Sequence, residues 1–280
     1  MENLETERSM ITTNRLFSLA LLLLFASSAL GQNGGYSIFK GTMVDMSWPE
    51  IKAAGEAGAL VLLPMAVIEE HGPHMSLGSD AYLTYHYCMK LKEELETRQI
   101  NAIVAPPIYW GIMQETETGA YPGSFTVQPA TMKALIHDVL ADLKRWGFTR
   151  VYPMNLHGDR LHQRTASEAM AEAKESLGLK IFGPEDRDPK NRPTVSRFKS
   201  PDAFSPDYHA GASETGEMVA NFPREVNVEK AKTLKPQSGF HPLGYVGDPA
   251  NYQNANIAAT EAYVKAEADE IARWLKAPAK

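Results

Sequence analysis

The sequence predicts an α/β protein, a three-layer α/β/α sandwich with a mostly parallel central sheet. Three short apolar runs, at residues 59–64, 102–107 and 150–155, show little alternation with polar residues, which is typical of strands buried on both faces. Amphipathic helical patterns at residues 80–98 and 129–146 separate these runs. A strand, helix, strand order favours parallel pairing through crossover helices, which then cover both faces of the sheet.

Two further helical patterns and one long loop complete the predicted domain. The helices are expected at residues 161–176 and at about 255–275. Residues 183–211 are rich in Pro and charge and follow neither a helical nor a strand period, which indicates a long loop. Long loops inside compact domains are often lids or interface segments, so we expect one of these roles, with a plain surface excursion as the alternative.

The first residues have the character of a targeting segment. Arg15 precedes an apolar run at residues 16–31 that ends in small residues and is too short to span a bilayer comfortably. We therefore expect residues 1–31 to be a signal peptide and residues 32–280 to be one exported domain, periplasmic or secreted. After cleavage no stable membrane insertion is expected. An uncleaved anchor helix is the alternative.

Composition restricts the partners and the source of stability. The 28 Lys and Arg residues are outnumbered by 34 Asp and Glu residues, giving a net charge of -6, so nucleic acid is not an expected partner. Cys88 is the only cysteine. An exported domain of this size must then do without an internal disulfide and rely on its core or on bound metal.

The densest group of metal-binding residue types is EEHGPHMSLGSD, residues 69–80, directly after the first predicted strand. This loop lies at the carboxyl edge of a parallel sheet, where open α/β folds place their sites. Glu69 and His71 are two residues apart, so an extended loop can turn an oxygen and a nitrogen toward one ion. Asp80 could bridge two ions or cap the next helix. For Glu69, His71 and His74 a solvated loop is the alternative.

Two further blocks carry the same residue types. MNLHGDR, at 154–160, again follows a predicted strand and contains His157 and Asp159, and two such strand ends can converge on one cleft. A helix cap is the alternative for Asp159. YHAGASETGEM, at 208–218, contains His209 and Glu214 at the start of a probable helix that Ser213 could cap. The helix dipole alone would favour Glu214 in a first turn.

These blocks, in this order, resemble the signature of the creatininase family of amidohydrolases. EEHGPHMSLGSD is similar to the family's Glu-x-His-Gly-Pro-His followed by Gly-x-Asp. The resemblance extends over nearly the whole chain after residue 31. It continues in YPGS at 121–124, NLHGD at 155–159, HAGASET at 209–215 and GYVGDP at 244–249.

The resemblance implies two divalent metal ions, for which zinc is expected and manganese or iron are alternatives. Glu69, Asp80 and His157 would hold one ion, and His71 with the shared Asp80 would hold the other. A further carboxylate is needed at the second ion. Asp159 matches the position used by creatinine-hydrolysing members and Glu214 matches that of most relatives, and we slightly favour Glu214 because Asp159 is one methylene shorter.

The resemblance also implies a reaction. A metal-activated hydroxide would attack an amide carbon, and His209, which matches the family's proton-transfer histidine, would protonate the leaving nitrogen. The expected substrate is a small cyclic or linear amide. Related enzymes form closed oligomers, often hexamers, so a homo-oligomer is expected. The alternatives are a formamide-type or peptide-modifying hydrolase, or a catalytically inactive metal-binding scaffold.

Departures from the family pattern concern the substrate pocket. Gly158 stands where creatinine-hydrolysing members have a Tyr, which argues against creatinine as substrate. Thr118 or Gly119 replaces the family's usual His before the Pro-Gly segment. An aromatic wall could be restored by Trp110, Tyr121 and Phe204.

Overall fold

The computed structural model describes residues 36–113, 121–191, 199 and 207–277. The chain divides into two units, residues 1–37 and residues 38–280, and everything below concerns the second. The predicted signal peptide, residues 1–31, lies outside the described residues, so export stays a prediction. No helix of the described part is both long and apolar enough to cross a bilayer.

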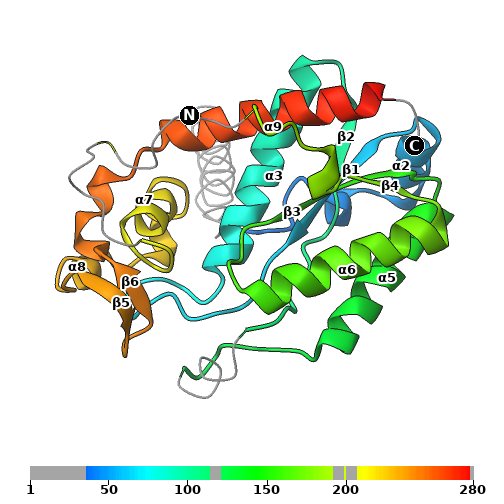
Figure 1. Cartoon of the computed structure of the whole chain (residues 1–280). Helices are drawn as coiled ribbons and strands as arrows, with labels where there is room; N and C mark the ends of the chain where they lie inside the picture. The colour runs from blue at the N-terminus through cyan, green and yellow to red at the C-terminus, as the bar shows by residue number, and fades with distance from the viewer. Residues whose placement is uncertain (1–35, 114–120, 192–198, 200–206, 278–280) are drawn as a thin grey trace, which may run out of the picture. The chain divides into compact units, whose positions relative to one another are not determined.

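The central sheet has four parallel strands in the order β2-β1-β3-β4, which confirms the predicted fold class (Figure 1). The strands are β1 (Leu60–Met65), β2 (Ala102–Val104), β3 (Arg150–Asn155) and β4 (Lys180–Ile181). Every residue of β1 is buried, as expected for a central strand covered on both faces. Because β1 and β3 are neighbours, the loops that follow them leave the same edge of the sheet side by side.

Alternate residues of β1 pack against helices on opposite faces. Leu60 and Leu62 join Leu91 and Ile271, from α3 (Ser79–Thr97) and α9 (Ala258–Lys276), in one apolar cluster. Val61 and Leu63 lie in a second cluster on the other face of the sheet. That face is covered by α2 (Trp48–Glu56), α5 (Pro129–Arg145) and α6 (Arg160–Leu177), completing the three layers.

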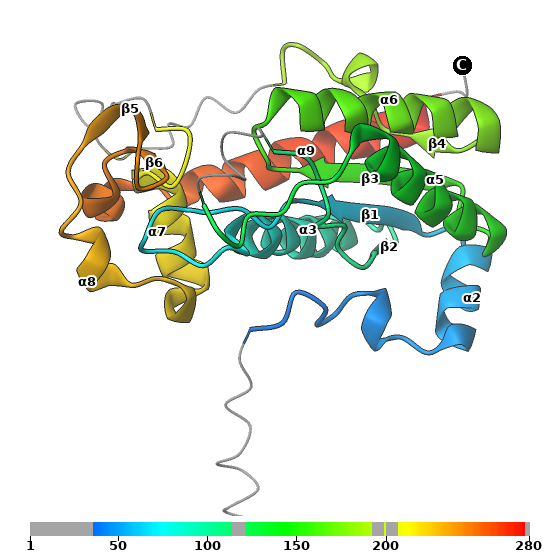
Figure 2. The ribbon, with the colours of Figure 1, turned by 90° about the horizontal axis from the view of Figure 1, so that it is seen from below.

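A smaller subdomain lies beyond the carboxyl ends of the strands (Figure 2). It consists of α7 (Ala212–Asn221), α8 (Val228–Ala231) and an antiparallel hairpin of β5 (Gln237–His241) and β6 (Tyr245–Gly247). A third apolar cluster, which includes Leu83, Met218 and Tyr245, joins it to α3. Short 3-10 helices complete the described elements: η1 (Met43–Asp45), η2 (Pro184–Asp186), η4 (Pro223–Glu225) and η5 (Pro249–Asn254).

The sequence patterns located three of the four strands of the central sheet and its longest helices. The helices predicted at 80–98, 129–146, 161–176 and 255–275 correspond to α3, α5, α6 and α9. The sequence did not indicate α2, β4 or the β5–β6 hairpin. The loop predicted at 183–211 contains η2, and residues 192–198 and 200–206 of it lie outside the described residues.

Cys88 lies on the face of α3 that packs on the sheet, with none of its surface exposed. Burial raises the pKa of its thiol well above the ordinary range, because the apolar surroundings disfavour the thiolate. The only cysteine is therefore a packing residue.

Gly55 tests how closely α2 packs on the end of α5. A Cβ at this position would lie 2.3 Å from the backbone oxygen of Trp146. Replacing a helical Gly by Ala ordinarily stabilises by about 0.5–1 kcal/mol. Here Gly55→Ala should instead lower the free energy of unfolding by about 1–3 kcal/mol, because backbone must shift. Urea unfolding measures the change, with Gly239→Ala in β5, which meets no atom within 4 Å, as the control expected to be stabilised by up to about 1 kcal/mol. A stabilised Gly55→Ala variant would contradict this packing.

Candidate metal centre

Glu69, His71 and Asp80 are carried by the loop after β1 and the first turn of α3. All three are buried, with 4%, 1% and 4% of their surface exposed. The backbone amide of Glu69 donates to the carbonyl of Leu77, which closes the loop on itself. Asp80 does not cap α3: the helix begins at Ser79 after Gly78, and the Asp80 carboxylate points instead toward two imidazoles. This outcome favours the metal interpretation over the capping one.

His157 approaches the same carboxylates from the loop after β3. Its Nε2 lies 3.1 Å from the carbonyl oxygen of Ile112, an acceptor, so this nitrogen carries the proton and donates. The lone pair is then on Nδ1. This nitrogen lies 3.0 Å from Asp80 Oδ2 and 3.2 Å from Glu69 Oε2. A backbone carbonyl that fixes the tautomer is the usual support of a metal-binding histidine.

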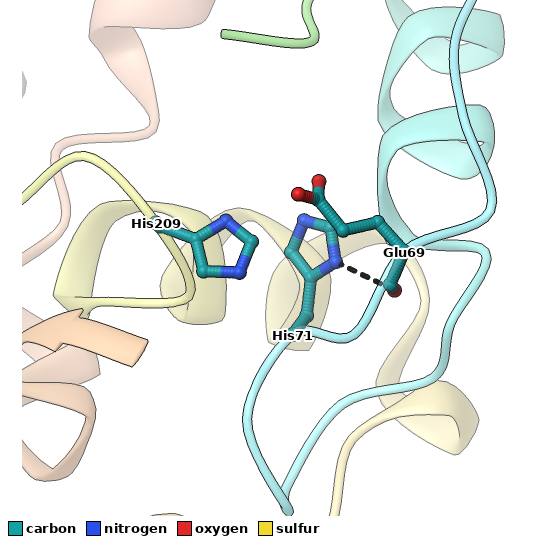
Figure 3. Close-up of side chains that lie close together, drawn as sticks. All are labelled: Glu69, His71 and His209. Carbon is teal, nitrogen blue, oxygen red and sulfur yellow. Dashed lines mark hydrogen bonds between the residues drawn. The ribbon is translucent and has the colours of Figure 1, made fainter. Parts of the chain in front are cut away.

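His71 is fixed in the same way but through its other nitrogen. Its Nδ1 lies 3.1 Å from the carbonyl oxygen of Glu69 and donates to it (Figure 3). The lone pair on Nε2 is left facing Asp80 Oδ1 at 3.3 Å and Glu214 Oε2 at 3.9 Å. Asp80 thus presents one oxygen to each histidine.

Lone pairs facing buried carboxylates require a positive charge between them. Burial alone would lower the pKa of His71, but the Asp80 and Glu214 carboxylates outweigh it and raise the pKa to about 10. Burial opposes charge at His157 too, yet Asp80 and Glu69 raise its pKa to about 11. Burial would raise the pKa of Asp80, but both histidines hold it well below its usual range. Protons on the imidazoles or a cation can supply the charge.

The donor set fits divalent transition metals. Among the described residues, ligand atoms within 4.8 Å of one another fall into three groups: Glu69, Asp80 and His157; His71, Asp80 and Glu214; and Glu69, His71 and His209. Carboxylate oxygen with imidazole nitrogen suits zinc, manganese or iron. The first two groups share Asp80, the arrangement that two bridged ions require.

Asp159 and Glu214, the alternatives for the last ligand, are separated by the structure. Asp159 is the N-cap of α6, and its Oδ1 accepts from the backbone amide of His162 at 2.7 Å. Asp159 belongs to no ligand group found among the described residues, whereas Glu214 does. The capping alternative therefore accounts for Asp159. Ser213 does not cap α7, because Gly211 takes that position and the Asp207 carboxylate accepts from the amide of Ser213.

His209 stands beside the two groups, held by its backbone and its ring. Its carbonyl accepts from the amide of Val246 in β6 at 2.7 Å. Its ring lies 4.7 Å from that of His71 and stacks on Phe240 of β5 at 5.5 Å. Ala210, the next residue, has a φ of 51°, and its amide donates to Glu214 Oε2 at 2.6 Å. The strained residue Ala210 thus connects His209, the proposed proton donor, to Glu214, the proposed ligand.

Several residues of the site had no sequence signal. Phe240 could not be identified because the sequence did not indicate the β5–β6 hairpin that carries it. Glu70, whose Oε1 lies 3.5 Å from His209 Nε2, stands between Glu69 and His71, which already accounted for the motif. His74 is buried rather than solvated and its Nε2 lies 2.8 Å from Thr215 Oγ1, which ties the loop to α7. Burial lowers the pKa of His74 to about 4, so this imidazole is neutral and structural.

Two of the three aromatic residues expected to line the pocket make ring contacts in the structure. Trp110 is 43% exposed and packs edge-to-face with Phe125 at 5.5 Å. Tyr121 contacts the edge of Phe240 at 6.1 Å, near His209. Phe204 and the positions 118 and 119 lie outside the described residues.

Fold and site together define a class: an α/β protein with a buried cluster of imidazoles and carboxylates at the carboxyl edge of a parallel sheet. Residues 44–275 match the family model described as creatininase, creatinine amidohydrolase. The chain belongs to the creatininase family of amidohydrolases, as the resemblance indicated.

Individual relatives agree with this assignment. Creatinine amidohydrolase of Pseudomonas putida is 31% identical over 125 residues, 43% of this chain and 45% of that protein, so the match spans less than half of that relative. The mycofactocin precursor peptide peptidase of Mycolicibacterium smegmatis is 27% identical over 231 residues, 77% of this chain and 85% of that protein.

Solved creatininases share the fold. One crystal structure of creatinine amidohydrolase has a TM-score of 0.66 at 21% identity, covering 85% of this chain and 99% of that one. A creatininase described as the Mn form and a variant described as Zn-Zn type each have a TM-score of 0.59 at 22% identity. They cover 83% and 88% of this chain, and 96% and 100% of their own.

Metal content after zinc loading separates the two carboxylates. The parent should retain about two equivalents after gel filtration, as a two-metal site requires. Glu214→Gln should lose about one equivalent, because the charged oxygen facing His71 is removed. Asp159→Asn should keep both, with at most about 1 kcal/mol lost from helix capping. Elemental analysis decides, and zinc lost from Asp159→Asn but kept by Glu214→Gln would reverse the assignment.

Proposed function

We propose that this protein is a metal-dependent amidohydrolase that cleaves a carbon–nitrogen amide bond. Glu69, Asp80 and His157 would hold one divalent ion, and His71, Asp80 and Glu214 the other. When bound, such a pair of ions supplies Lewis-acid chemistry, lowering the pKa of a shared water and polarising the substrate carbonyl. Zinc is the expected metal, with manganese or iron as alternatives.

One observation carries this proposal. Backbone carbonyls fix the tautomers of His71 and His157 so that both lone pairs face the two oxygens of Asp80. Two protonated imidazoles could also compensate the charge of the carboxylates. They would not require that Nδ1 of His71 and Nε2 of His157 each be fixed by a backbone carbonyl. Preorganised tautomers are what two metal ions need, because each ligand must offer a lone pair without reorganising.

His209 is the residue that we assign to proton transfer. Its ring is only 12% exposed and lies against His71, so it reaches the place where a substrate bound near the two groups would sit. An amide nitrogen leaves poorly unless it is protonated, and an imidazole can donate that proton and later recover one from water.

The proposed range of substrates extends beyond small cyclic amides. A Cβ on Gly158 would meet no atom within 4 Å, so the position next to His157 leaves open space. The peptidase relative aligns over more of the chain than the creatinine-hydrolysing relative does. We therefore favour a linear amide, with a peptide-modifying reaction as the first alternative and a formamide-type amide or creatinine itself as further ones.

Substitution of His209 tests the reaction and its mechanism together. Zinc-loaded protein is incubated with creatinine, an N-formyl amine and a short peptide, and the released amine is measured by mass spectrometry. On whichever amide is cleaved, His209→Asn should lower kcat by about 10²–10⁴-fold, as expected for a lost general acid. Metal content should stay at the parent's value. Two bound metals with no hydrolysis of any probe would favour the catalytically inactive scaffold instead.

Export and self-association are separate proposals. They rest on residues 16–31 and on the family resemblance, respectively. Expression of the full chain followed by fractionation should yield a periplasmic or secreted protein that begins near residue 32, as N-terminal sequencing would establish. A cytosolic protein with its first 31 residues intact would contradict export. Light scattering of the same preparation gives the oligomeric state.

A further inference from the structure

Glu70 is a buried carboxylate that faces away from the proposed metal ligands and toward His209. It is 6% exposed, and its Oε1 lies 3.5 Å from His209 Nε2, within ion-pair distance. Neither of these two buried atoms has a hydrogen-bond partner among the described residues, so the ion-pair contact joins two otherwise unsatisfied polar atoms. Glu70 also belongs to none of the ligand groups found in the described part of the chain. The Oε1 of this carboxylate thus faces His209 and not the groups of candidate ligands.

Ser124 holds the other end of the Glu70 carboxylate. The Ser124 hydroxyl donates to Glu70 Oε2 at 3.1 Å and accepts from the backbone amide of Glu70 at 2.9 Å. The amide of the next residue, Phe125, donates to the carbonyl of Ile68 at 3.0 Å. These bonds fasten residues 124–125 to the loop after β1, so the carboxylate has one anchored oxygen and one oxygen directed at the imidazole.

The hairpin covers this arrangement from a third side. Gly244 has a φ of 76°, and a Cβ there would lie 2.7 Å from Glu70 Cγ, so the β5–β6 turn passes directly over the Glu70 side chain. The same hairpin holds the backbone of His209 through Val246 and stacks Phe240 on its ring. The hairpin thus sets the position and tilt of the His209 ring. The group beside Nε2 decides which ring nitrogen carries the proton.

We propose that Glu70 is a positioning residue for His209, anchored by Ser124. A carboxylate beside Nε2 selects the tautomer with the proton on Nε2 and leaves Nδ1 as the nitrogen that exchanges a proton with the reacting group. The arrangement resembles a catalytic base that a neighbouring group orients: here Glu70 orients His209, and Ser124 holds Glu70. The inference rests on the proposed role of His209 in proton transfer.

The first test separates positioning from structural support by changing the leaving group. Glu70→Gln keeps the shape of the side chain and removes its charge. It is assayed as zinc-loaded protein on two substrates with the same acyl part, an alkyl amide and an aryl ester. The amine must be protonated to leave, whereas the phenolate need not be. We expect kcat on the amide to fall about 10–100-fold and kcat on the ester less than threefold, with KM and metal content unchanged.

Two further variants control this experiment. Ser124→Ala should show the same preference for the ester with a smaller loss, because it frees the carboxylate without removing it. Glu267→Gln alters another buried carboxylate, which pairs with Arg187 and belongs to none of the ligand groups found among the described residues, and should change both substrates equally. Equal losses on amide and ester in Glu70→Gln, or no loss on either, would overturn the proposal.

The second test needs no substrate and stands even if the proposed function fails. Zinc-loaded protein with ¹⁵N-labelled histidine is observed by NMR, and the His209 signals are assigned by their loss in His209→Gln. The parent should show a resolved, hydrogen-bonded proton on Nε2 of His209. In Glu70→Gln this signal should broaden or move upfield as the tautomer is released. An unchanged Nε2 proton in that variant would overturn the proposal whatever the activity measurements give.

Discussion

The Asp80 carboxylate, shared between two histidines that arrive from different strands, is the interaction on which the rest of the site depends. Its two oxygens face His71 Nε2 and His157 Nδ1 at 3.3 and 3.0 Å. Buried carboxylates are costly unless positive charge compensates them. The fold supplies that compensation only because β1 and β3 are neighbours, which brings the two loops together, and because α3 begins where the first loop ends. The same arrangement that would be costly in an apolar core forms the two groups of candidate metal ligands that share Asp80.

Much of this could be predicted from the sequence, because strand ends of a parallel sheet share an edge. Glu69, His71, Asp80 and His157 all follow apolar runs, and the structure gathers them within a few ångströms. The strand order could not be predicted in the same way. β2 lies between β1 and β3 along the chain, yet it occupies the edge of the sheet. β1 therefore pairs with β2 on one side and with β3 on the other.

Other parts of the site could not be predicted because one residue type serves two purposes. An acidic residue near the start of a helix can accept from a free backbone amide or can bind an ion. Which of the two it does depends on where the helix begins. Asp159 satisfies the amide of His162, while Asp80 and Glu214, in first turns rather than at caps, face the histidines. Glu70 and Phe240 act through contacts between segments distant in sequence, which no local pattern records.

The buried cysteine separates the stability of the fold from disulfide chemistry. Cys88 is wholly enclosed between α3 and the sheet, and burial keeps its thiol protonated. It can neither form a disulfide without unpacking the core nor serve as a reactive thiolate. The stability of the fold therefore does not rest on a disulfide. Because the sequence has one cysteine and the structure buries it, oxidants and thiols have no disulfide within the chain to make or break.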